Sequence, residues 1–319
     1  MIRSVLRVLS PGGAGAKLSI LIFHRVLRQP DVLCPDVPDL ARFERELRWI
    51  SDWFQVLPLD EAATRLAAGS LPPRAAAITF DDGYADNATV ALPALLRAGL
   101  PATFFIATSF LDGGRMWNDT VIESVRACRS PALDLRAVGL GRLGLGNIES
   151  RRQAIAQLLP AIKYLEPSQR EAAVNVVQQA SGERLPDGLM MRSEQVLALR
   201  GAGMQIGAHT RSHPILTRLS DAAAADEIVG SKRDLELLLG EPVTLFAYPN
   251  GKPGIDYGPS HSRMVQEAGF AAAVSTSPGA ASADSDRFQL PRFSPWDRGR
   301  TRYGLRMLAN LREGSGLRV

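Results

Sequence analysis

Two adjacent carboxylates, Asp81 and Asp82, follow a short apolar run over 75–80 that predicts a buried strand. Neighbouring acids repel each other, so a strand end that keeps both must stabilise them with a cation or let one hold a proton. In a metal hydrolase, one such carboxylate can bind the metal while the other accepts a proton from metal-bound water. Asp-Asp-Gly is also common in solvent-exposed turns. Other residues of the chain are therefore needed to distinguish a metal site from such a turn.

Two of the four histidines in the chain, His209 and His213, stand within one hexapeptide, His-Thr-Arg-Ser-His-Pro. The hexapeptide follows a predicted strand, and Pro214 favours a loop over a helix interior. Two imidazoles and one carboxylate from the Asp81-Asp82 pair would make a three-ligand metal site with an open position for water. The alternative is that the histidines only satisfy buried polar groups of the core.

The elements around these motifs alternate between strands and helices. Strands are predicted over 17–23, 75–80, 102–107, 204–208, 243–248, 270–275 and 288–293. Helices are predicted over 39–54, 59–68, 86–98, 193–203, 220–239 and 260–268. This alternation predicts an α/β fold in which a parallel sheet, open or closed into a barrel, carries the functional residues at its C-terminal strand ends.

The alternation stops between about residues 112 and 191. Helices are predicted there over 149–165 and 168–180, without strands between them. We interpret this segment as a helical insertion that covers or flanks the site. Trp117 is expected to lie near the mouth of the site and to contact substrate, although a tryptophan at such a position is often a packing residue.

The sequences Thr-Phe-Asp-Asp-Gly at 79–83 and His-Thr-Arg-Ser-His at 209–213 resemble, as a pair, the motifs of the polysaccharide deacetylases, carbohydrate esterase family 4 with its NodB-type domain. The resemblance covers about residues 18–293 apart from the insertion. It implies a distorted (β/α) barrel of about seven parallel strands. It also implies a metal-dependent enzyme, commonly with zinc, that removes N-acetyl groups from amino sugars of a polysaccharide or a lipid-linked glycan.

The resemblance assigns roles to the motif residues. Asp82, His209 and His213 match the metal ligands of the family, and Asp81 matches its general base. The chain differs from many members at Ala247, where they carry an arginine that orients the base. Arg292, at the end of the last predicted strand, is expected to supply that charge.

The residues after Ala247 are Tyr248, Pro249 and Asn250. Tyr248 and Pro249 are expected to contact substrate. The tight turn at Asn250 is expected to aim its backbone N–H at the oxyanion that forms when water attacks the acetamide.

The late Leu-x-Leu-His motif, which provides the general acid in the family, is absent from this chain. Leu-Ile-Phe-His-Arg at 21–25 resembles that motif moved to the N-terminus, as in members with a circularly permuted barrel. His24 is therefore predicted to protonate the leaving amine. On its own, a histidine that ends a strand would more often be a capping or packing residue.

Composition restricts the class of protein. With 319 residues, 45% hydrophobic and 22% charged, the chain has the composition of an ordinary globular protein. Only Cys34 and Cys128 are present, which favours a reducing compartment such as the cytoplasm over a disulfide framework. Basic residues without aromatic stacking platforms disfavour nucleic acid as a partner. No continuous apolar run predicts a secretory signal or a membrane span.

Residues 1–16 are expected to form a basic arm or a short amphipathic helix, separate from the barrel over 17–319. No acidic residue precedes Asp31, whereas Arg3 and Arg7 lie in the first turns. One helical face carries the apolar residues Ile2, Val5, Leu6 and Leu9. We therefore expect weak peripheral association with an anionic membrane, with a packing arm as the alternative.

Two other functions remain compatible with these residues. One is hydrolysis of another C–N bond, in a formamide or a cyclic amide, because the fold alone does not determine the substrate. The other is carbohydrate binding without catalysis, which the intact Asp81, Asp82, His209 and His213 argue against.

Overall fold

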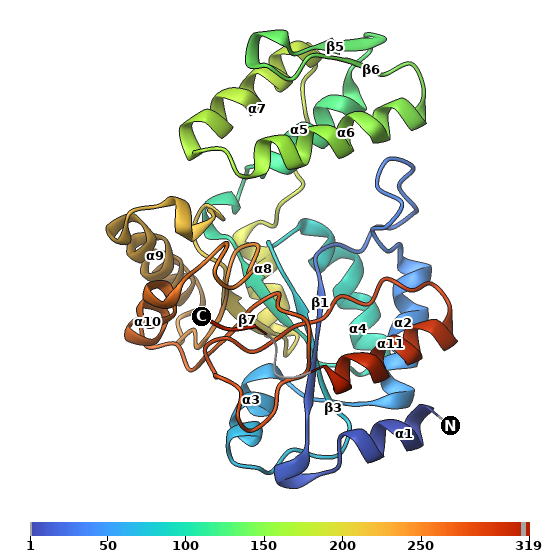
Figure 1. Ribbon diagram of the computed structural model, residues 1–319, viewed down its shortest axis with the longest axis vertical. Coiled ribbons are helices and arrows are strands. Elements are labelled where there is room, and N and C mark those ends of the chain that lie inside the picture. Colours follow the sequence, from blue (N-terminus) through green and yellow to red (C-terminus); the bar gives the residue numbers. More distant parts are fainter. Residues whose placement is uncertain (1, 314–316) are drawn as a thin grey trace.

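The computed structural model describes residues 2–313 and 317–319 (Figure 1). Its main element is a seven-stranded sheet in which all pairs are parallel, with the order β1-β3-β4-β7-β8-β9 and β2 paired to the start of β3. The strands are β1 Leu18–Phe23, β2 Gln55–Val56, β3 Ala75–Phe80, β4 Thr103–Ile106, β7 Gln205–Ala208, β8 Leu245–Ala247 and β9 Ala272–Val274. The predicted parallel α/β fold is confirmed.

The segment 288–293 bridges the two edge strands of this curled sheet, although it is not itself a regular strand. Leu290 forms a parallel bridge with Val274 of β9, and Phe293 forms one with Leu21 of β1. The N–H of Phe293 donates to Ile20 O at 2.9 Å. The result is the distorted (β/α) barrel of the NodB type that the sequence predicted.

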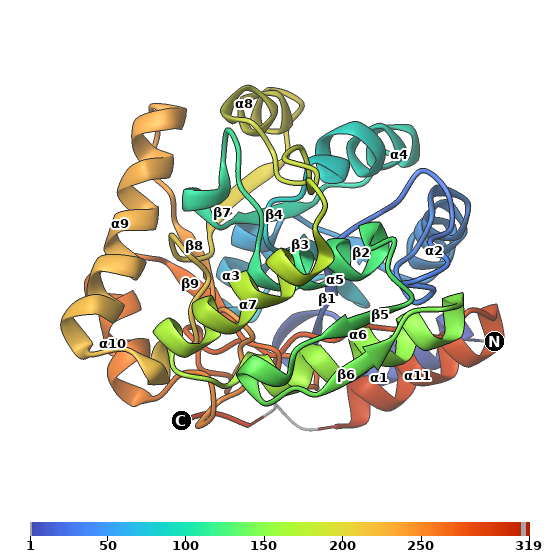
Figure 2. The ribbon, with the colours of Figure 1, turned by 90° about the horizontal axis from the view of Figure 1, so that it is seen from above.

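Helices surround the sheet (Figure 2). They are α2 Leu40–Trp53, α3 Leu59–Ala67, α4 Leu92–Ala98, α8 Ser193–Gly201, α9 Asp221–Leu239, α10 Pro259–Glu267 and α11 Arg300–Arg312. Short 3-10 turns cover Gly13–Gly15, Thr108–Phe110, Arg136–Val138 and Leu216–Arg218. The helix predicted over 86–98 opens with a π-helical turn, Asn87–Ala91, before α4. The sequence interpretation did not include α11.

A stack of phenylalanines holds the strand ends that carry the site. Every residue of β1 and β3 is buried, as expected for parallel strands covered on both faces. The ring of Phe80 stacks on Phe23 at 5.4 Å and on Phe104 at 4.8 Å, measured between centroids. Phe23 and Phe80 directly precede His24 and Asp81 in the chain. The packing of these rings therefore fixes the backbone positions from which the side chains of His24 and Asp81 extend.

The insertion forms a small layer with its own apolar core at one end of the barrel (Figure 1). Its elements are α5 Trp117–Ala127, β5 Ala132–Asp134, β6 Arg142–Gly144, α6 Ile148–Lys163 and α7 Pro167–Ser181. The two predicted helices correspond to α6 and α7. As predicted, no strand lies between these two helices, but an antiparallel hairpin of β5 and β6, which was not predicted, precedes α6.

The N-terminal residues Ile2–Leu9 form the short helix α1, which packs against α11. Leu6 is fully buried, and Ile2 and Leu9 pack against the main core. The apolar face considered for membrane insertion is therefore covered by the protein, while Arg3 and Arg7 are exposed. Within residues 2–313 and 317–319, the structure contains no helix with the length and apolarity that crossing a bilayer requires.

Candidate active site and metal centre

The carboxyl ends of the parallel strands meet at one edge of the sheet, as in other parallel barrels. His24 follows β1, Asp81 and Asp82 follow β3, and His209 follows β7. A cavity of about 520 Å³ opens at this edge, and its lining includes His24, Asp81, Asp82, His209, His213 and Asn250. The structure thus brings together six of the residues singled out from the sequence.

The three expected ligands present a compact donor set. Ligand atoms of Asp82, His209 and His213 all lie within 4.8 Å of one another. Oδ1 of Asp82 is 3.4 Å from Nε2 of each histidine. Nδ1 of His209 donates to Ala247 O at 2.7 Å, which leaves the Nε2 lone pair free for a metal. One carboxylate and two imidazoles, with room for water, fit a divalent ion such as zinc.

The backbone is strained where the ligands emerge. The φ angles of Asp82, Thr210 and His213 are +78°, +61° and +54°. Left-handed conformations of such residues cost about 1–3 kcal/mol each and persist only where the surroundings enforce them. Oγ1 of Thr210 accepts the His213 N–H at 3.1 Å and donates to His209 O at 2.5 Å, so this side chain joins the two histidines.

Glu227 on α9 holds the loop between the two histidines. Its Oε2 accepts the N–H groups of Arg211 and Ser212, both at 2.8 Å. Its Oε1 accepts the Ser212 hydroxyl at 2.5 Å. Sequence reasoning missed this residue, because nothing marks one acid among those of a long helix as the partner of a loop 15 residues away.

Burial and charge shift the pKa values of the ligand set. Burial raises the pKa of Asp82, but the hydrogen bond with His209 and the neighbouring histidines outweigh it, so the pKa is lowered. Burial lowers the pKa of His213 to about 4, which keeps that imidazole in the neutral form that binds metals. Burial also acts to lower the pKa of His209, but Asp81 and Asp82 raise it overall.

Asp81 is bound by Arg292. The guanidinium donates from Nη1 to Oδ1 at 2.6 Å and from Nη2 to Oδ2 at 2.7 Å. Its Nε donates to Ser275 O at 2.9 Å, and Nη1 also reaches Thr79 Oγ1 at 3.2 Å. Burial raises the pKa of Asp81, but Arg292 and His209 lower it overall, so the carboxylate is ionised near neutral pH.

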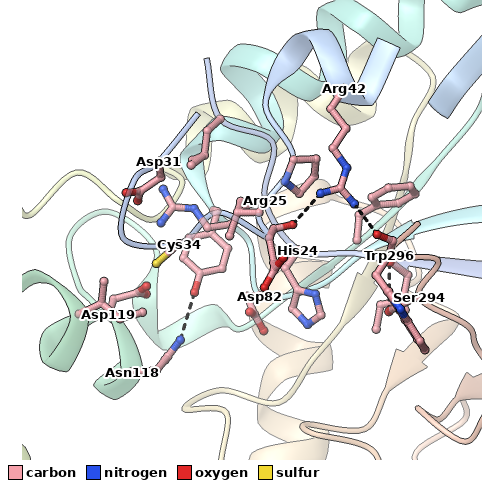
Figure 3. A pocket seen from close by; sticks show the side chains of 18 of the residues that line it. His24, Arg25, Asp31, Cys34, Arg42, Asp82, Asn118, Asp119, Ser294 and Trp296 are labelled. Carbon is pink, nitrogen blue, oxygen red and sulfur yellow. Dashed lines mark hydrogen bonds between the residues drawn. The ribbon is translucent and has the colours of Figure 1, made fainter. Parts of the chain in front are cut away.

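His24 is exposed to the cavity, and its backbone is held by the segment after β3. Nδ2 of Asn87 donates to His24 O at 2.8 Å. Nε of Arg25 donates to Asp86 at 2.8 Å, and the carboxylate of Asp86 also accepts the Val26 N–H. Figure 3 shows the side chains of His24 and Asp82 facing the same cavity. His24 is therefore on the same side of the sheet as the candidate metal ligands.

Two residues that were expected to contact substrate, Tyr248 and Pro249, do not line the cavity. Tyr248 is fully buried, its hydroxyl donates to Phe288 O at 3.0 Å, and its ring stacks on Tyr257 at 3.8 Å. Pro249 is also buried, and neither residue lines the cavity. Successive residues of a strand point to opposite faces, so Tyr248 enters the main core while Ala247 enters the smaller one. Trp117 does line the cavity, as expected.

Several lining residues were not predicted as site residues. The cavity of the candidate metal ligands is also lined by Lys163 at the end of α6, Lys252 and Thr276. Asp119 and Tyr84 line a second cavity beside it. The lysines come from the insertion and from a loop, where sequence patterns carry no information about which side chain faces a cavity.

Residues 68–128 and 155–273 match the family model described as polysaccharide deacetylase, and the chain belongs to that family. Membership supports a hydrolase that deacetylates a polysaccharide. The family is in general metal-dependent, which agrees with the possible Asp-His-His site.

Individual proteins are similar to this chain in sequence or in fold. The chain is 22% identical over 279 residues to the putative polysaccharide deacetylase YxkH of Bacillus subtilis, covering 87% of this chain and 71% of that protein. Its fold is similar to IcaB from Ammonifex degensii, with a TM-score of 0.59, 17% identity and coverage of 92% and 98% of the two chains. It is also similar to the Streptococcus pyogenes deacetylase PplD, with a TM-score of 0.58, 18% identity and coverage of 88% and 92%.

Proposed function

We propose that the protein is a divalent-metal-dependent N-deacetylase that removes acetyl groups from amino sugars of a glycan. The observation that carries this proposal is the donor set of Asp82, His209 and His213 beside a carboxylate, Asp81, that Arg292 holds in place. Zinc is the favoured ion, because one oxygen and two nitrogen ligands are a common catalytic zinc set.

A metal bound there would lower the pKa of a bound water and polarise the acetamide carbonyl. Asp81 would accept the proton of the attacking water, a role that suits an ionised carboxylate whose two oxygens have fixed positions. Arg292 would orient Asp81.

His24 and Asn250 would act on the other atoms of the amide. His24 would donate a proton to the leaving amine, which suits an exposed imidazole on the cavity wall. The Asn250 N–H makes no hydrogen bond within the described part of the chain, and its residue lines the cavity with φ +58°. This N–H would stabilise the developing oxyanion.

Acetate release from defined substrates tests the proposal. The protein would be depleted of metal with a chelator, reloaded with Zn²⁺, and assayed on N-acetylglucosamine oligomers, on their N-formyl analogues and on a cyclic amide. We expect acetate release that depends on the metal and exceeds turnover of the other amides. A preference for the formyl or cyclic substrate would favour another C–N hydrolase, and binding without turnover would favour a carbohydrate-binding protein.

We further propose a cytoplasmic location with weak electrostatic attachment to anionic membranes through Arg3 and Arg7. Each basic residue near such a surface contributes about 1 kcal/mol. Sedimentation with phosphatidylserine vesicles at low and high salt tests this, using the double variant Arg3→Ala, Arg7→Ala, which leaves the buried Leu6 in place. We expect low-salt binding by the native chain and loss of binding in the variant. Equal sedimentation of both would contradict the attachment.

A further inference from the structure

A second cavity, of about 400 Å³, opens directly beside the metal site (Figure 3). It shares His24, Asp82 and Asn118 with the cavity of the metal ligands. Its volume is in the range of small-molecule binding sites. A ligand group in it would therefore be a direct neighbour of a group that reacts at the metal site.

Among the charged side chains that line this second cavity, carboxylates outnumber guanidiniums. The carboxylates are Asp31, Asp36, Glu46, Asp82, Asp119 and Glu123. The guanidiniums are Arg25, Arg42 and Arg126. The excess of negative charge favours a cationic ligand group.

All but one of these carboxylates have a cationic partner or belong to the metal site. Arg42 pairs with Glu46 at 2.7 Å, and Arg126 pairs with both Asp31 at 2.5 Å and Glu123 at 3.1 Å. Arg298 pairs with Asp36 at 3.4 Å. Arg25 pairs with Asp86, which does not line the cavity, at 2.8 Å. Among the described residues, Asp119 is the lining carboxylate without a cation within ion-pair distance.

Asp119 is also almost completely buried. Its side chain belongs to α5 of the insertion, the residue is 3% exposed, and Oδ2 has no hydrogen-bond partner. Figure 3 shows its carboxyl group turned toward the cavity. Burial raises the pKa of Asp119 to about 7, against the opposing influence of Arg25 and of the Tyr84 hydroxyl. A buried carboxylate without a cation is unfavourable, and a ligand that brings a cation would relieve it.

We propose that this cavity binds a sugar unit with a free, protonated amine, next to the acetamido sugar that is being deacetylated, and that Asp119 pairs with its ammonium group. The inference rests on the proposed function. Hydrolysis of the amide yields acetate and an amine, which takes up a proton near neutral pH. The product of one cycle would then occupy the subsite in the next, and a partly deacetylated glycan would be a better substrate than a fully acetylated one.

The apolar part of the cavity is compatible with a sugar ring. Trp296 lies at its wall with 61% of its surface exposed, and the guanidinium of Arg306 covers one face of the indole at 3.9 Å. Flat apolar surface combined with a few placed polar groups is the usual composition of a small-molecule site.

Disaccharides test the selectivity. The native protein would be assayed on N,N′-diacetylchitobiose and on both isomers that carry one glucosamine and one N-acetylglucosamine. We expect kcat/KM to be about 10- to 100-fold higher for one amine-bearing isomer than for the diacetylated disaccharide. This ratio corresponds to the free energy of one charge-assisted hydrogen bond. In Asp119→Asn, which keeps the shape and removes the charge, the ratio should fall toward one. In the matched control Asp284→Asn, an exposed aspartate remote in sequence, the ratio should be unchanged.

Binding without catalysis provides a second test. Chitobiose with both amines free has no acetyl group to hydrolyse, so calorimetric titration measures binding separately from turnover. We expect Asp119→Asn to bind it at least about tenfold more weakly than the native protein. Equal affinities, or an absence of amine preference in a native protein that does release acetate, would overturn the subsite. Amine binding that depends on Asp119 without any acetate release would instead overturn the proposed function.

Discussion

Arg292 donates to both carboxylate oxygens of Asp81, at 2.6 and 2.7 Å, although the two residues are 211 positions apart in the chain. Both are almost completely buried, so each charge depends on the other. The segment 288–293, which contains Arg292, bridges the two edge strands of the sheet, β9 and β1. Because β1 pairs with β3, this segment lies close to the end of β3, where Asp81 follows. A bidentate pair fixes the orientation of the carboxylate as well as its charge.

Replacement of Arg292 should change the pH dependence of the reaction. In Arg292→Lys, a single ammonium group replaces the planar guanidinium that binds both oxygens of Asp81. Asp81 then loses its fixed orientation, and its pKa is lowered less than in the native protein. We expect kcat to fall by about 10²-fold and the acidic limb of the kcat/KM profile to move to higher pH. Arg65→Lys on the surface of α3 is the control. An unchanged acidic limb would show that Asp81 is not the group that must be ionised.

The histidine ligands should control metal content. His209→Ala or His213→Ala should lose bound metal and nearly all turnover, because two protein ligands rarely retain a catalytic zinc. Elemental analysis together with circular dichroism checks this. His261→Asn is a suitable control, because His261 accepts the Gly258 N–H at 2.9 Å in a role that asparagine can fill. Retention of stoichiometric metal in both alanine variants would refute the ligand set.

His24 should act on the leaving group alone. His24→Ala is expected to keep its metal and to lower kcat by about 10²- to 10³-fold. A substrate with a more acidic leaving amine should be less affected, because it needs less proton donation. Near-normal turnover of the sugar substrate would leave the general acid unassigned.

Asp119 should make stability depend on pH in a direction opposite to most acids. Its pKa is about 7 in the folded protein and near 4 when unfolded, so the folded state alone binds its proton between those values. The stability of the native protein relative to Asp119→Asn should therefore fall as pH rises from about 4 to 7, and then stay constant. Thermal melting of both proteins at pH 5 and pH 8 measures this. A constant difference in melting temperature would mean that Asp119 has an ordinary pKa.

Local patterns were sufficient for the strand ends and for bringing the candidate ligands together, whereas the choice of Asp82 over Asp81 as a ligand came from the family resemblance. Apolar runs that end at Asp81 and His209 predicted buried strands, and parallel strands bring such ends to one edge. Hydrophobic periodicity also located α6 and α7 within the insertion. These features depend on neighbours in the sequence, so the sequence alone contains the information.

The remaining features depend on contacts between distant segments. The β5–β6 hairpin has only three residues in each strand, too few for a periodic pattern. The burial of Tyr248 follows from the pleat of β8, where a shift of one residue moves a side chain from one core to the other. Trp117, at the start of α5, was expected near the mouth of the site, but no local pattern indicated that Asp119 lines the second cavity.

In the proposed mechanism the two adjacent carboxylates have different roles, because Asp82 binds the metal and Asp81 accepts a proton. The most direct measurement compares metal content and acetate release in Asp82→Ala and Asp81→Asn, purified and loaded with Zn²⁺ side by side. We expect Asp82→Ala to lose both the metal and the activity, and Asp81→Asn to keep the metal while kcat falls by about 10²- to 10⁴-fold. Loss of metal from Asp81→Asn with retention in Asp82→Ala would reverse the two roles, and full activity in either variant would contradict the proposed mechanism.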